Sequence, residues 1–223
     1  MKGIASLVVT AVLSVTAATT PHTARHAARR TGVARLTPAQ RHAIKAAGEW
    51  HRGCPVWMSQ LRVLSFRYYG FDRATHIGQV VVNAEVAHPL AKVFGQLYRM
   101  RFPIRDAAFA STYGPHPDQS GDVTASMECR DAAASPCSSS ASTHHWSMHA
   151  YGEAIDLDPR ENPYVGCGMT RDRTALSYLK RSHHRRGMVT PAVRRAFASI
   201  GWGWGGAWFG STKDYMHFSI NGH

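Results

Sequence analysis

Acidic residues are scarce in this chain of 223 residues, which carries 14 Asp and Glu against 26 Lys and Arg and has a formal net charge of +12. The basic residues gather in two segments, Arg25–Arg35 and Arg171–Arg195. A positive field of this strength favours an anionic partner. The charge alone fits nucleic acid, an anionic polymer outside the cell, or a solvated surface with no partner.

The apolar run at the amino terminus is too short to be a comfortable membrane span. It follows Met1-Lys2, extends from Ile4 to Ala18 without a charge, and ends in the small residues of Val15–Ala18. A basic start, an apolar centre and a small-residue exit are the layout of a secretory signal. We therefore expect residues 1–18 to be a signal peptide, with an uncleaved interfacial anchor as the alternative. After cleavage we expect a secreted protein with no integral membrane segment, for which an anionic cell-wall polymer is the favoured partner.

The chain has only four cysteines and no CxxC pair, which argues against a zinc ribbon. In an exported protein these cysteines are expected to form disulfides, with three connectivities open. We predict the pairs Cys54–Cys129 and Cys137–Cys167.

No internal repeat appears, and strands and helices follow one another in mixed order, which predicts an α+β fold with a small antiparallel sheet flanked by helices. We expect a flexible basic tail over residues 19–36 and a single domain over residues 37–223. Capping residues and apolar spacing predict three helices, and alternation of β-branched and aromatic residues predicts the strands. The predicted helices are Thr37–Gly48, Ala84–Arg101 and Thr190–Ile200; the predicted strands are Leu61–Tyr69, His76–Val82, Ala107–Ser111, Ser126–Arg130, Ala154–Asp158 and Met216–Ile220.

Two segments are predicted to be irregular. Residues Thr112–His145 are rich in Ser, Gly, Pro and Asp, and Asn162–Arg186 is irregular and basic. Loops of this length in a compact domain are usually functional or tied by disulfides.

The strongest functional signal comes from two short stretches, Trp146–Pro159 (WSMHAYGEAIDLDP) and Lys213–Ser219 (KDYMHFS). They offer His149, Asp156 and His217, which are two imidazoles and one carboxylate. This ligand set suits one catalytic Zn²⁺ with a fourth position open, although other first-row metals also accept it.

The local pattern places these side chains on different elements. Gly152 and the alternation around Ile155 indicate that His149 lies on a turn and Asp156 on the strand that follows. His217 would then join from an adjacent strand. Asp214, three residues before His217, is predicted to be the general base that takes a proton from the zinc-activated water.

Other readings of these residues are weaker. Ser147, His149 and Asp156 could form a Ser-His-Asp triad, but Ser147 lacks the GxSxG context of a nucleophile. The chain has 14 histidines, and we expect four of them to be surface or loop residues, namely His144, His145, His183 and His184.

The two stretches read as SxHxxGxAID, from Ser147 to Asp156, and DxMHF, from Asp214 to Phe218. Together they resemble the D-alanyl-D-alanine carboxypeptidase family of zinc peptidases, which includes vancomycin-resistance carboxypeptidases and phage L-alanyl-D-glutamate endolysins. Flanking residues at Gly53–Pro55, Arg101–Ile104 and Gly201–Gly206 look like its exported, actinobacterial-type branch. The resemblance extends from about Gly53 to Ser219.

The resemblance implies that His149, Asp156 and His217 bind zinc, that Asp214 is the base, and that the fold is shared with the Hedgehog signalling domain. It also implies an Arg that binds substrate and stabilises developing negative charge, a role that suits a fixed cation. Arg130 is our candidate, although its Glu-Cys-Arg-Asp context departs from the Tyr-Arg-Ser context of many relatives, so Arg101 and Arg105 stay as alternatives.

We assign Ser147 and Trp208 as substrate contacts. Trp202, Trp204 and Trp208 could each wall the cleft, and core packing is as good an interpretation for at least two of them.

These expectations lead to a monomeric, exported zinc peptidase that acts on the stem peptides of peptidoglycan. The alternative is a non-catalytic zinc-containing module that binds the cell wall. A nucleic-acid binder would rest on charge alone, because the sequence has no recognised nucleic-acid-binding motif.

Overall fold

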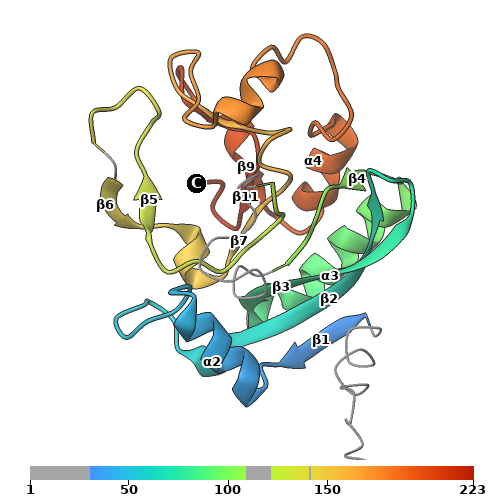
Figure 1. Ribbon diagram of the computed structural model, residues 1–223, viewed down its shortest axis with the longest axis vertical. Helices are drawn as coiled ribbons and strands as arrows, with labels where there is room; N and C mark the ends of the chain where they lie inside the picture. Colours follow the sequence, from blue (N-terminus) through green and yellow to red (C-terminus); the bar gives the residue numbers. More distant parts are fainter. Residues whose placement is uncertain (1–30, 109–121, 141) are drawn as a thin grey trace, which may run out of the picture.

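The computed structural model describes residues 31–108, 122–140 and 142–223. It is a mixed α and β structure built on small, mostly antiparallel sheets, which confirms the predicted α+β class. A large curved sheet occupies the lower half of the molecule in Figure 1, and the carboxy-terminal half of the chain packs above it. The predicted signal peptide lies outside the described residues.

The large sheet is formed by two long antiparallel strands, β2 and β3. On the other edge of β2, β1 pairs with its first half and β4 with its last two residues. Side chains of β2 alternate between two hydrophobic clusters. Leu64, Phe66 and Tyr68 face the cluster under α3, whereas Leu61 and Val63 face the cluster under α2. Because successive side chains of a strand point to opposite faces, both faces of this sheet are covered. The bounds are β1 (Gly32–Arg35), β2 (Leu61–Gly70), β3 (Thr75–Asn83) and β4 (Pro103–Ile104).

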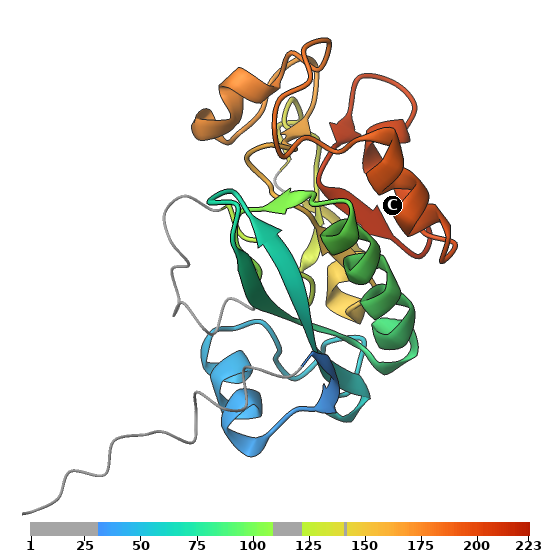
Figure 2. The same cartoon turned by 90° about the vertical axis from the view of Figure 1, so that its right-hand side faces the viewer.

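Helix α3 (Ala84–Arg99) covers one face of the large sheet, and Figure 2 shows it beside α4 (Pro191–Ala198). Its amino terminus is capped by Asn83, whose side-chain oxygen accepts a hydrogen bond from the backbone of Glu85. The apolar residues recur at helical spacing and are buried, and Phe94 stacks on Phe66 of β2 with ring centroids 3.7 Å apart. Helix α2 (Pro38–Ala46) lies on the opposite face and has a complete capping box formed by Thr37 and Gln40.

The smaller antiparallel sheet has the order β7-β11-β9, with β7 at Ala154–Asp156, β11 at His217–Ser219 and β9 at Gly203–Trp204. Its inner face continues the core under α3. Phe218 stacks on Phe197 of α4 with centroids 3.9 Å apart, and both rings are fully buried. This packing holds the small sheet firmly against both helices.

The remaining elements are short and lie around the small sheet. They are the strand pairs β5 (Asp131–Ala133) with β6 (Ser142–Trp146) and β8 (Tyr164–Val165) with β10 (Lys213–Asp214), and the 3₁₀ helices η1 (Met58–Gln60), η3 (Met148–Tyr151), η4 (Arg173–Tyr178) and η5 (Gly205–Ala207). None of the helices in the described ranges has the length and hydropathy that a membrane span requires.

The disulfides form as predicted, with Cys54 bonded to Cys129 and Cys137 bonded to Cys167. The four histidines expected at the surface are all exposed. The three predicted helices and the strand pair β2–β3 are also confirmed, with shifts of a few residues at their ends.

Two predictions need correction. The tail expected through residue 36 ends earlier, because Gly32–Arg35 pairs with β2 and Leu36 is buried. Ser126–Arg130 is not a strand, since regular pairing starts only at Asp131.

The long segments expected to be irregular are less uniform than predicted. Thr112–His145 includes the strands β5 and most of β6, and its residues 112–121 and 141 lie outside the described ranges. Asn162–Arg186 includes β8 and η4. Of the predicted strand Ala107–Ser111, only residues 107 and 108 are described, and Ala107 forms a single bridge with Thr124.

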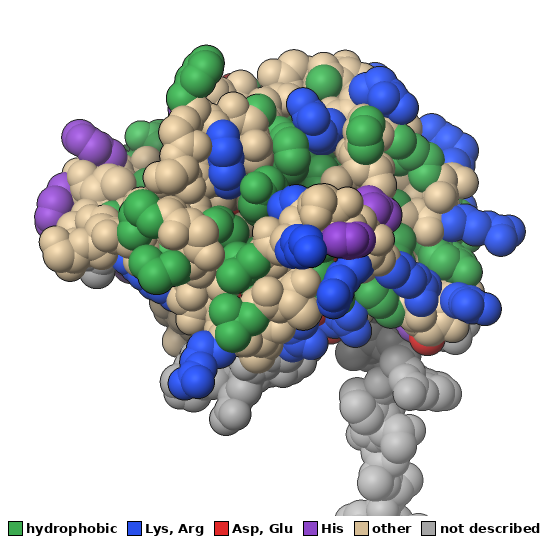
Figure 3. Space-filling view, turned by 90° about the horizontal axis from the view of Figure 1, so that it is seen from above, with side chains coloured by type: hydrophobic (Ala, Val, Ile, Leu, Met, Phe, Trp, Pro, Cys, Tyr) green, Lys and Arg blue, Asp and Glu red, His purple; other side chains and the backbone are tan. Residues whose placement is uncertain are grey.

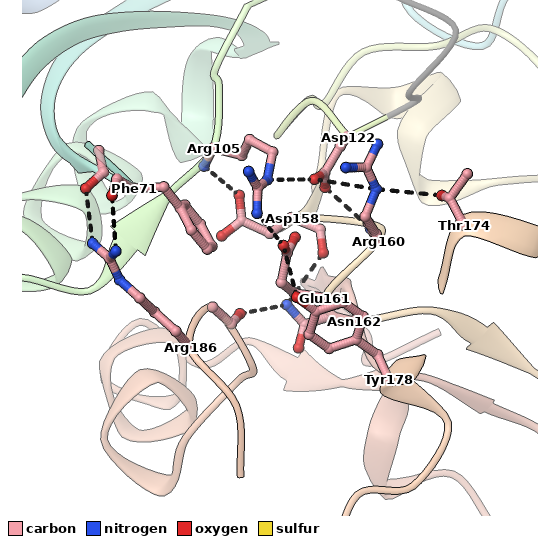
Figure 4. A network of polar contacts seen from close by, with 12 residues as sticks. Phe71, Arg105, Asp122, Asp158, Arg160, Glu161, Asn162, Thr174, Tyr178 and Arg186 are labelled. Atoms are coloured by element: carbon pink, nitrogen blue, oxygen red, sulfur yellow. Dashed lines mark hydrogen bonds and ion pairs between the residues drawn. The ribbon is translucent and has the colours of Figure 1, made fainter. Parts of the chain in front are cut away.

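A buried polar network joins the large sheet to the upper half of the molecule (Figure 4). The guanidinium of Arg105 lies between two fully buried carboxylates, with Nε 2.7 Å from Asp122 Oδ2 and one terminal nitrogen 2.6 Å from Glu161 Oε1. Its backbone N–H donates to Asp158 Oδ1, and its side chain stacks on Phe71. Arg105 therefore balances the charge of carboxylates that water cannot reach, which excludes it as the substrate-binding arginine.

Replacing Arg105 by Ala should lower the free energy of unfolding by about 3 kcal/mol at pH 8. This value is the lower end of the range for breaking a buried ion pair, because the guanidinium is partly exposed. The loss should be smaller at pH 5. Burial and the charge of Glu161 raise the pKa of Asp122 from 3.8 to about 7, so the folded state binds this proton more tightly than the unfolded state does. The stability that the bound proton contributes is therefore lost as the pH rises toward 7 and above.

Removal of Arg105 raises the pKa of Asp122 further, because a nearby positive charge is lost. Protonation of Asp122 at low pH then removes the carboxylate charge that Arg105 had balanced. Denaturant titration at both pH values measures the effect, with Arg41→Ala as the exposed control. A loss that does not depend on pH would contradict the assignment.

Candidate metal centre

The SxHxxG part of the first motif forms a short capped helix that presents His149. The hydroxyl of Ser147 accepts a hydrogen bond from the backbone N–H of His149 and caps η3. Gly152 ends the helix in the left-handed conformation at φ 67°, where a Cβ atom would lie 2.8 Å from the backbone nitrogen of Asn83. Glycine is therefore needed here both for its conformation and for close approach to the end of β3.

The AID part of the motif forms β7, and it pairs with β11 so that Asp156 lies directly opposite His217. On the other side of β7, Ala125 forms an antiparallel bridge with Asp156. The prediction of a turn followed by a strand, with an adjacent strand carrying His217, agrees with this geometry, and the turn is the 3₁₀ helix η3.

Three ligand atoms converge at this point. Nε2 of His149 is 3.1 Å from Oδ1 of Asp156, Nδ1 of His217 is 3.2 Å from the same oxygen, and the two nitrogens are 3.2 Å apart. A tetrahedral zinc ion with bonds of about 2.0–2.1 Å places its ligand atoms roughly 3.3–3.4 Å from one another. The triangle therefore fits zinc to within a few tenths of an ångström, and both imidazoles are almost completely buried.

The orientation of His149 is set by a backbone acceptor. Its Nδ1 lies 2.6 Å from the carbonyl oxygen of Ser126, which can only accept a hydrogen bond, so Nδ1 carries the proton and the lone pair of Nε2 points into the triangle. The sequence does not reveal this acceptor, because any residue supplies a carbonyl. The bridge between Ala125 and Asp156 is what brings Ser126 into reach.

The electrostatics of the triangle favour a cation. Burial alone would raise the pKa of Asp156, but His149 and His217 hold it well below its usual range. Burial alone would lower the pKa of His149, and Asp156 outweighs it, so that this pKa is raised. A buried carboxylate between two imidazoles thus supplies the negative charge that a divalent ion needs.

Asp214 lines the same cavity from β10 as a second carboxyl group, and it is half-buried with its Oδ1 shielded from solvent. Burial and the charge of Asp156 raise its pKa to about 7. Its Oδ1 has no hydrogen-bond partner within the described residues. Asp214 is held close to η5, since a Cβ atom on Gly205 would lie 2.8 Å from the Cβ of Asp214. Such a carboxyl group can exchange a proton near neutral pH.

The cavity around these residues has a volume of about 180 Å³. It contains all seven residues predicted to form the site. Five others line it as well. The lining residues are Arg130, Ala132, Ala133, Ser147, His149, Asp156, Tyr164, Trp208, Asp214, Met216, His217 and His223.

Of the three arginines considered for substrate binding, Arg130 lines the cavity, and Arg101 and Arg105 do not. Nε of Arg130 forms an ion pair with Glu128 at 2.7 Å, and its NH1 donates to the carbonyl of Asp131. Burial lowers the pKa of Arg130, but Glu128 and the two site aspartates raise it overall, so the group stays charged. Sequence reasoning missed Glu128, although its position two residues before Arg130 places both on the same side of an extended chain.

Aromatic residues form one wall of the cavity. Trp208 meets the ring of Tyr164 edge-on and stacks on His223, while its indole N–H donates to the carbonyl of Gly222. Trp202 is buried in the core, and the half-buried Trp204 packs against it. The interpretation that two of the three tryptophans serve core packing is therefore confirmed. Tyr164 and His223 were not predicted.

Residues 140–220 match the family model described as D-alanyl-D-alanine carboxypeptidase. The matched segment contains both motifs and every residue of the ligand triangle, and it supports a hydrolase of the peptidase class. Comparisons with curated proteins and with solved structures find no match. The roles of individual residues rest on the geometry described above.

The protein should bind one zinc ion, and His217→Ala should weaken this binding by more than ~100-fold, since even the loss of an outer partner of a ligand costs 10- to 100-fold. Metal analysis after dialysis and competition with a chelating dye measure the change. His145→Ala, on the exposed strand β6, is the matched control. Equal zinc affinity in the two variants would show that the triangle is not the metal site.

Proposed function

We propose that this chain is an exported zinc metallopeptidase that hydrolyses a peptide bond in the stem peptide of peptidoglycan, as D-alanyl-D-alanine carboxypeptidases do. The observation that carries the proposal is the convergence of ligand atoms of His149, Asp156 and His217 within 3.2 Å of one another, in a cavity that Asp214 also lines. The match of residues 140–220 supports the same chemistry.

When bound, a zinc ion supplies Lewis-acid chemistry, which polarises a carbonyl group and makes a water nucleophilic near neutral pH. Asp214 accepts the proton of the attacking water and returns it to the leaving amine. A cation in the triangle offsets the charge of Asp156, so it lowers the pKa of Asp214 from its metal-free value and keeps the base ionised.

Arg130 supplies a fixed positive charge in the wall of the same cavity. It binds a carboxylate of the substrate or balances the negative charge that develops on the carbonyl oxygen. Glu128 and the carbonyl of Asp131 hold its guanidinium in place. Trp208 and Ser147 are proposed as substrate contacts, and the hydroxyl of Ser147 also positions His149.

The proposal includes the finer features expected from the motifs. These are the exported, actinobacterial-type branch of the family, the fold relation to the Hedgehog signalling domain, a single domain that acts as a monomer, and a location outside the cell in contact with the wall. The two disulfides support this location, because such bonds persist in oxidising compartments.

The direct test is mass spectrometry of defined muropeptides digested with the zinc-loaded protein. The expected result is cleavage at one stem-peptide bond, and the products identify it as D-Ala-D-Ala, L-Ala-D-Glu or a cross-bridge. Binding to purified walls without any product would instead favour the alternative, a non-catalytic zinc-containing module. The carboxyl group of Asp214, which lines the same cavity as the ligand triangle, argues for the enzyme.

Asp214→Asn should retain zinc and lose turnover by about 10²- to 10⁴-fold, because the amide cannot accept the proton of the attacking water. Rate measurements on a stem peptide, with metal content determined in parallel, separate the two effects. Asp72→Asn changes a carboxylate at the protein surface and should leave the rate unchanged. Normal turnover by Asp214→Asn would exclude Asp214 as the base.

Arg130→Gln should lower kcat/KM by about 10²-fold or more, through loss of the charge that faces the developing oxyanion. Arg101→Gln, which alters the alternative arginine outside the cavity, should have no effect. Steady-state kinetics on one stem peptide decide between them. A larger effect at Arg101 than at Arg130 would reverse the assignment.

A further inference from the structure

We propose that the surface formed by residues 171–195, called here the basic face, binds an anionic polymer of the cell envelope whose charges are phosphodiester groups and which carries no nucleobases. None of these residues lines the cavity at His149. The inference therefore concerns a separate surface and does not depend on peptide hydrolysis.

The basic face has an unusual charge composition. Between Arg171 and Arg195 the sequence contains seven Arg and one Lys against a single acidic residue, Asp172. All eight cations except the half-buried Arg181 are exposed. Figure 3 looks down on this side of the molecule, where Lys and Arg side chains are spread across the surface and very little Asp or Glu is visible.

Among the described residues, the cations of the basic face form no ion pair with a carboxylate. Within the described ranges, the arginines that pair with carboxylates are Arg105, Arg130 and Arg160, all outside this segment. Asp172 is used locally, since its side chain caps η4 by accepting from the backbone and hydroxyl of Thr174. The charge of the face is therefore available to an external anion.

The acidic residues that could have neutralised this side of the molecule are buried instead. Asp122, Asp158 and Glu161 lie in the network around Arg105 and are at most 1% exposed. A protein with few acidic residues thus places several of them where they cannot screen the surface, and the basic face is more positive than the net charge suggests.

Several arginines of the basic face are held in place by neutral groups. Arg171 donates to the carbonyl oxygens of Ser135 and Ser140, and Arg186 donates to those of Gly70 and Phe71. Arg181 donates to the carbonyl of Glu161 and to the side chain of Asn162, and Arg185 and Arg194 lie over aromatic rings. These contacts leave the positive charge intact and leave guanidinium donors free for phosphate oxygens.

The chemistry of the face favours a polymer without bases. Proteins that bind single-stranded nucleic acids combine positive charge with aromatic rings on which bases stack. Besides the imidazoles of His183 and His184, the segment has one aromatic residue, Tyr178, whose hydroxyl donates to buried Glu161 and whose ring is covered by Arg185. The disulfides also point to a compartment outside the reducing cytoplasm. A polyol-phosphate polymer meets both conditions.

The test uses the full chain and a fluorescent poly(glycerol phosphate), with affinity measured by anisotropy over a range of salt concentrations. The test variant is Arg173→Glu/Lys180→Glu/Arg195→Glu, three exposed positions whose side chains form no hydrogen bond, ion pair or ring contact in the described part of the chain. The control is Arg35→Glu/Arg41→Glu/Arg52→Glu, which makes the same change in formal charge around β1 and α2, at the other end of the molecule in Figure 1.

The test variant should bind at least ~10-fold more weakly than the unaltered protein, because each cation near an anionic polymer contributes to affinity. Its affinity should also depend less steeply on salt. The control should bind almost as tightly as the unaltered protein. Equal weakening in the two variants would show that net charge, and not the basic face, drives binding, and would overturn the proposal.

Additional control measurements separate loss of folding and general charge effects from loss of the binding surface. Circular dichroism checks that both variants fold, and the single variants Lys180→Glu and Arg195→Glu, each expected to weaken binding, replace the triple variant if it does not. Tighter binding of a single-stranded DNA or of poly-glutamate of matched charge would also overturn the proposal. Hydrolysis of a soluble stem peptide should be the same in all these proteins, so failure of hydrolysis with retained polymer binding would count only against the peptidase.

Discussion

The antiparallel pairing of β7 with β11 is the constraint on which the metal centre depends. It places His217 directly opposite Asp156, and side chains at such positions have Cβ atoms only about 4.5–5.5 Å apart. The next pair in the register, Ile155 and Phe218, points to the other face and is fully buried. A slip of one residue would turn His217 into the core and Phe218 into the cavity, so hydrophobic packing fixes the register that the ligands require.

The third ligand is positioned by the large sheet. Gly152, at the end of η3, accepts a hydrogen bond from the backbone of Asn83, and the side chain of Asn83 donates to Tyr151 while its oxygen caps α3. One asparagine therefore joins the end of β3, the start of α3 and the helix that carries His149. The candidate metal centre therefore lies at a junction between the two sheets: the small sheet carries Asp156 and His217, and the large sheet positions the helix that carries His149.

The parts of this arrangement that could be predicted are those with a local chemical cause. Capping residues and apolar spacing indicate α2, α3 and α4, and the glycine and alternation after His149 indicate the turn and strand of the motif. Strand β1 escaped prediction because it pairs through backbone hydrogen bonds while its side chains are mostly exposed, which leaves no apolar pattern. The Ser126 acceptor and the ion pairs of Arg105 connect residues far apart in sequence, and no local pattern encodes such contacts.

The cavity walls are stabilised by different interactions from those that position the ligand triangle. The hydrophobic core reaches Phe218 and Ile155, but the substrate side is built from loops and two- or three-residue strands that bury little apolar surface. The Cys137–Cys167 disulfide lies there, and the Cys54–Cys129 disulfide adjoins this side from the cluster under α2. Cys129, bonded to Cys54, directly precedes Arg130, whose carbonyl accepts from the backbone of Ser147.

The second disulfide, Cys137–Cys167, joins the β5–β6 hairpin to the loop after β8, and each of these elements contributes to the cavity, through Ala133 and Tyr164. Covalent links thus hold the walls where packing alone would leave them mobile. The three predicted ligands owe their positions to the core, whereas disulfides help to hold Arg130 and the aromatic wall.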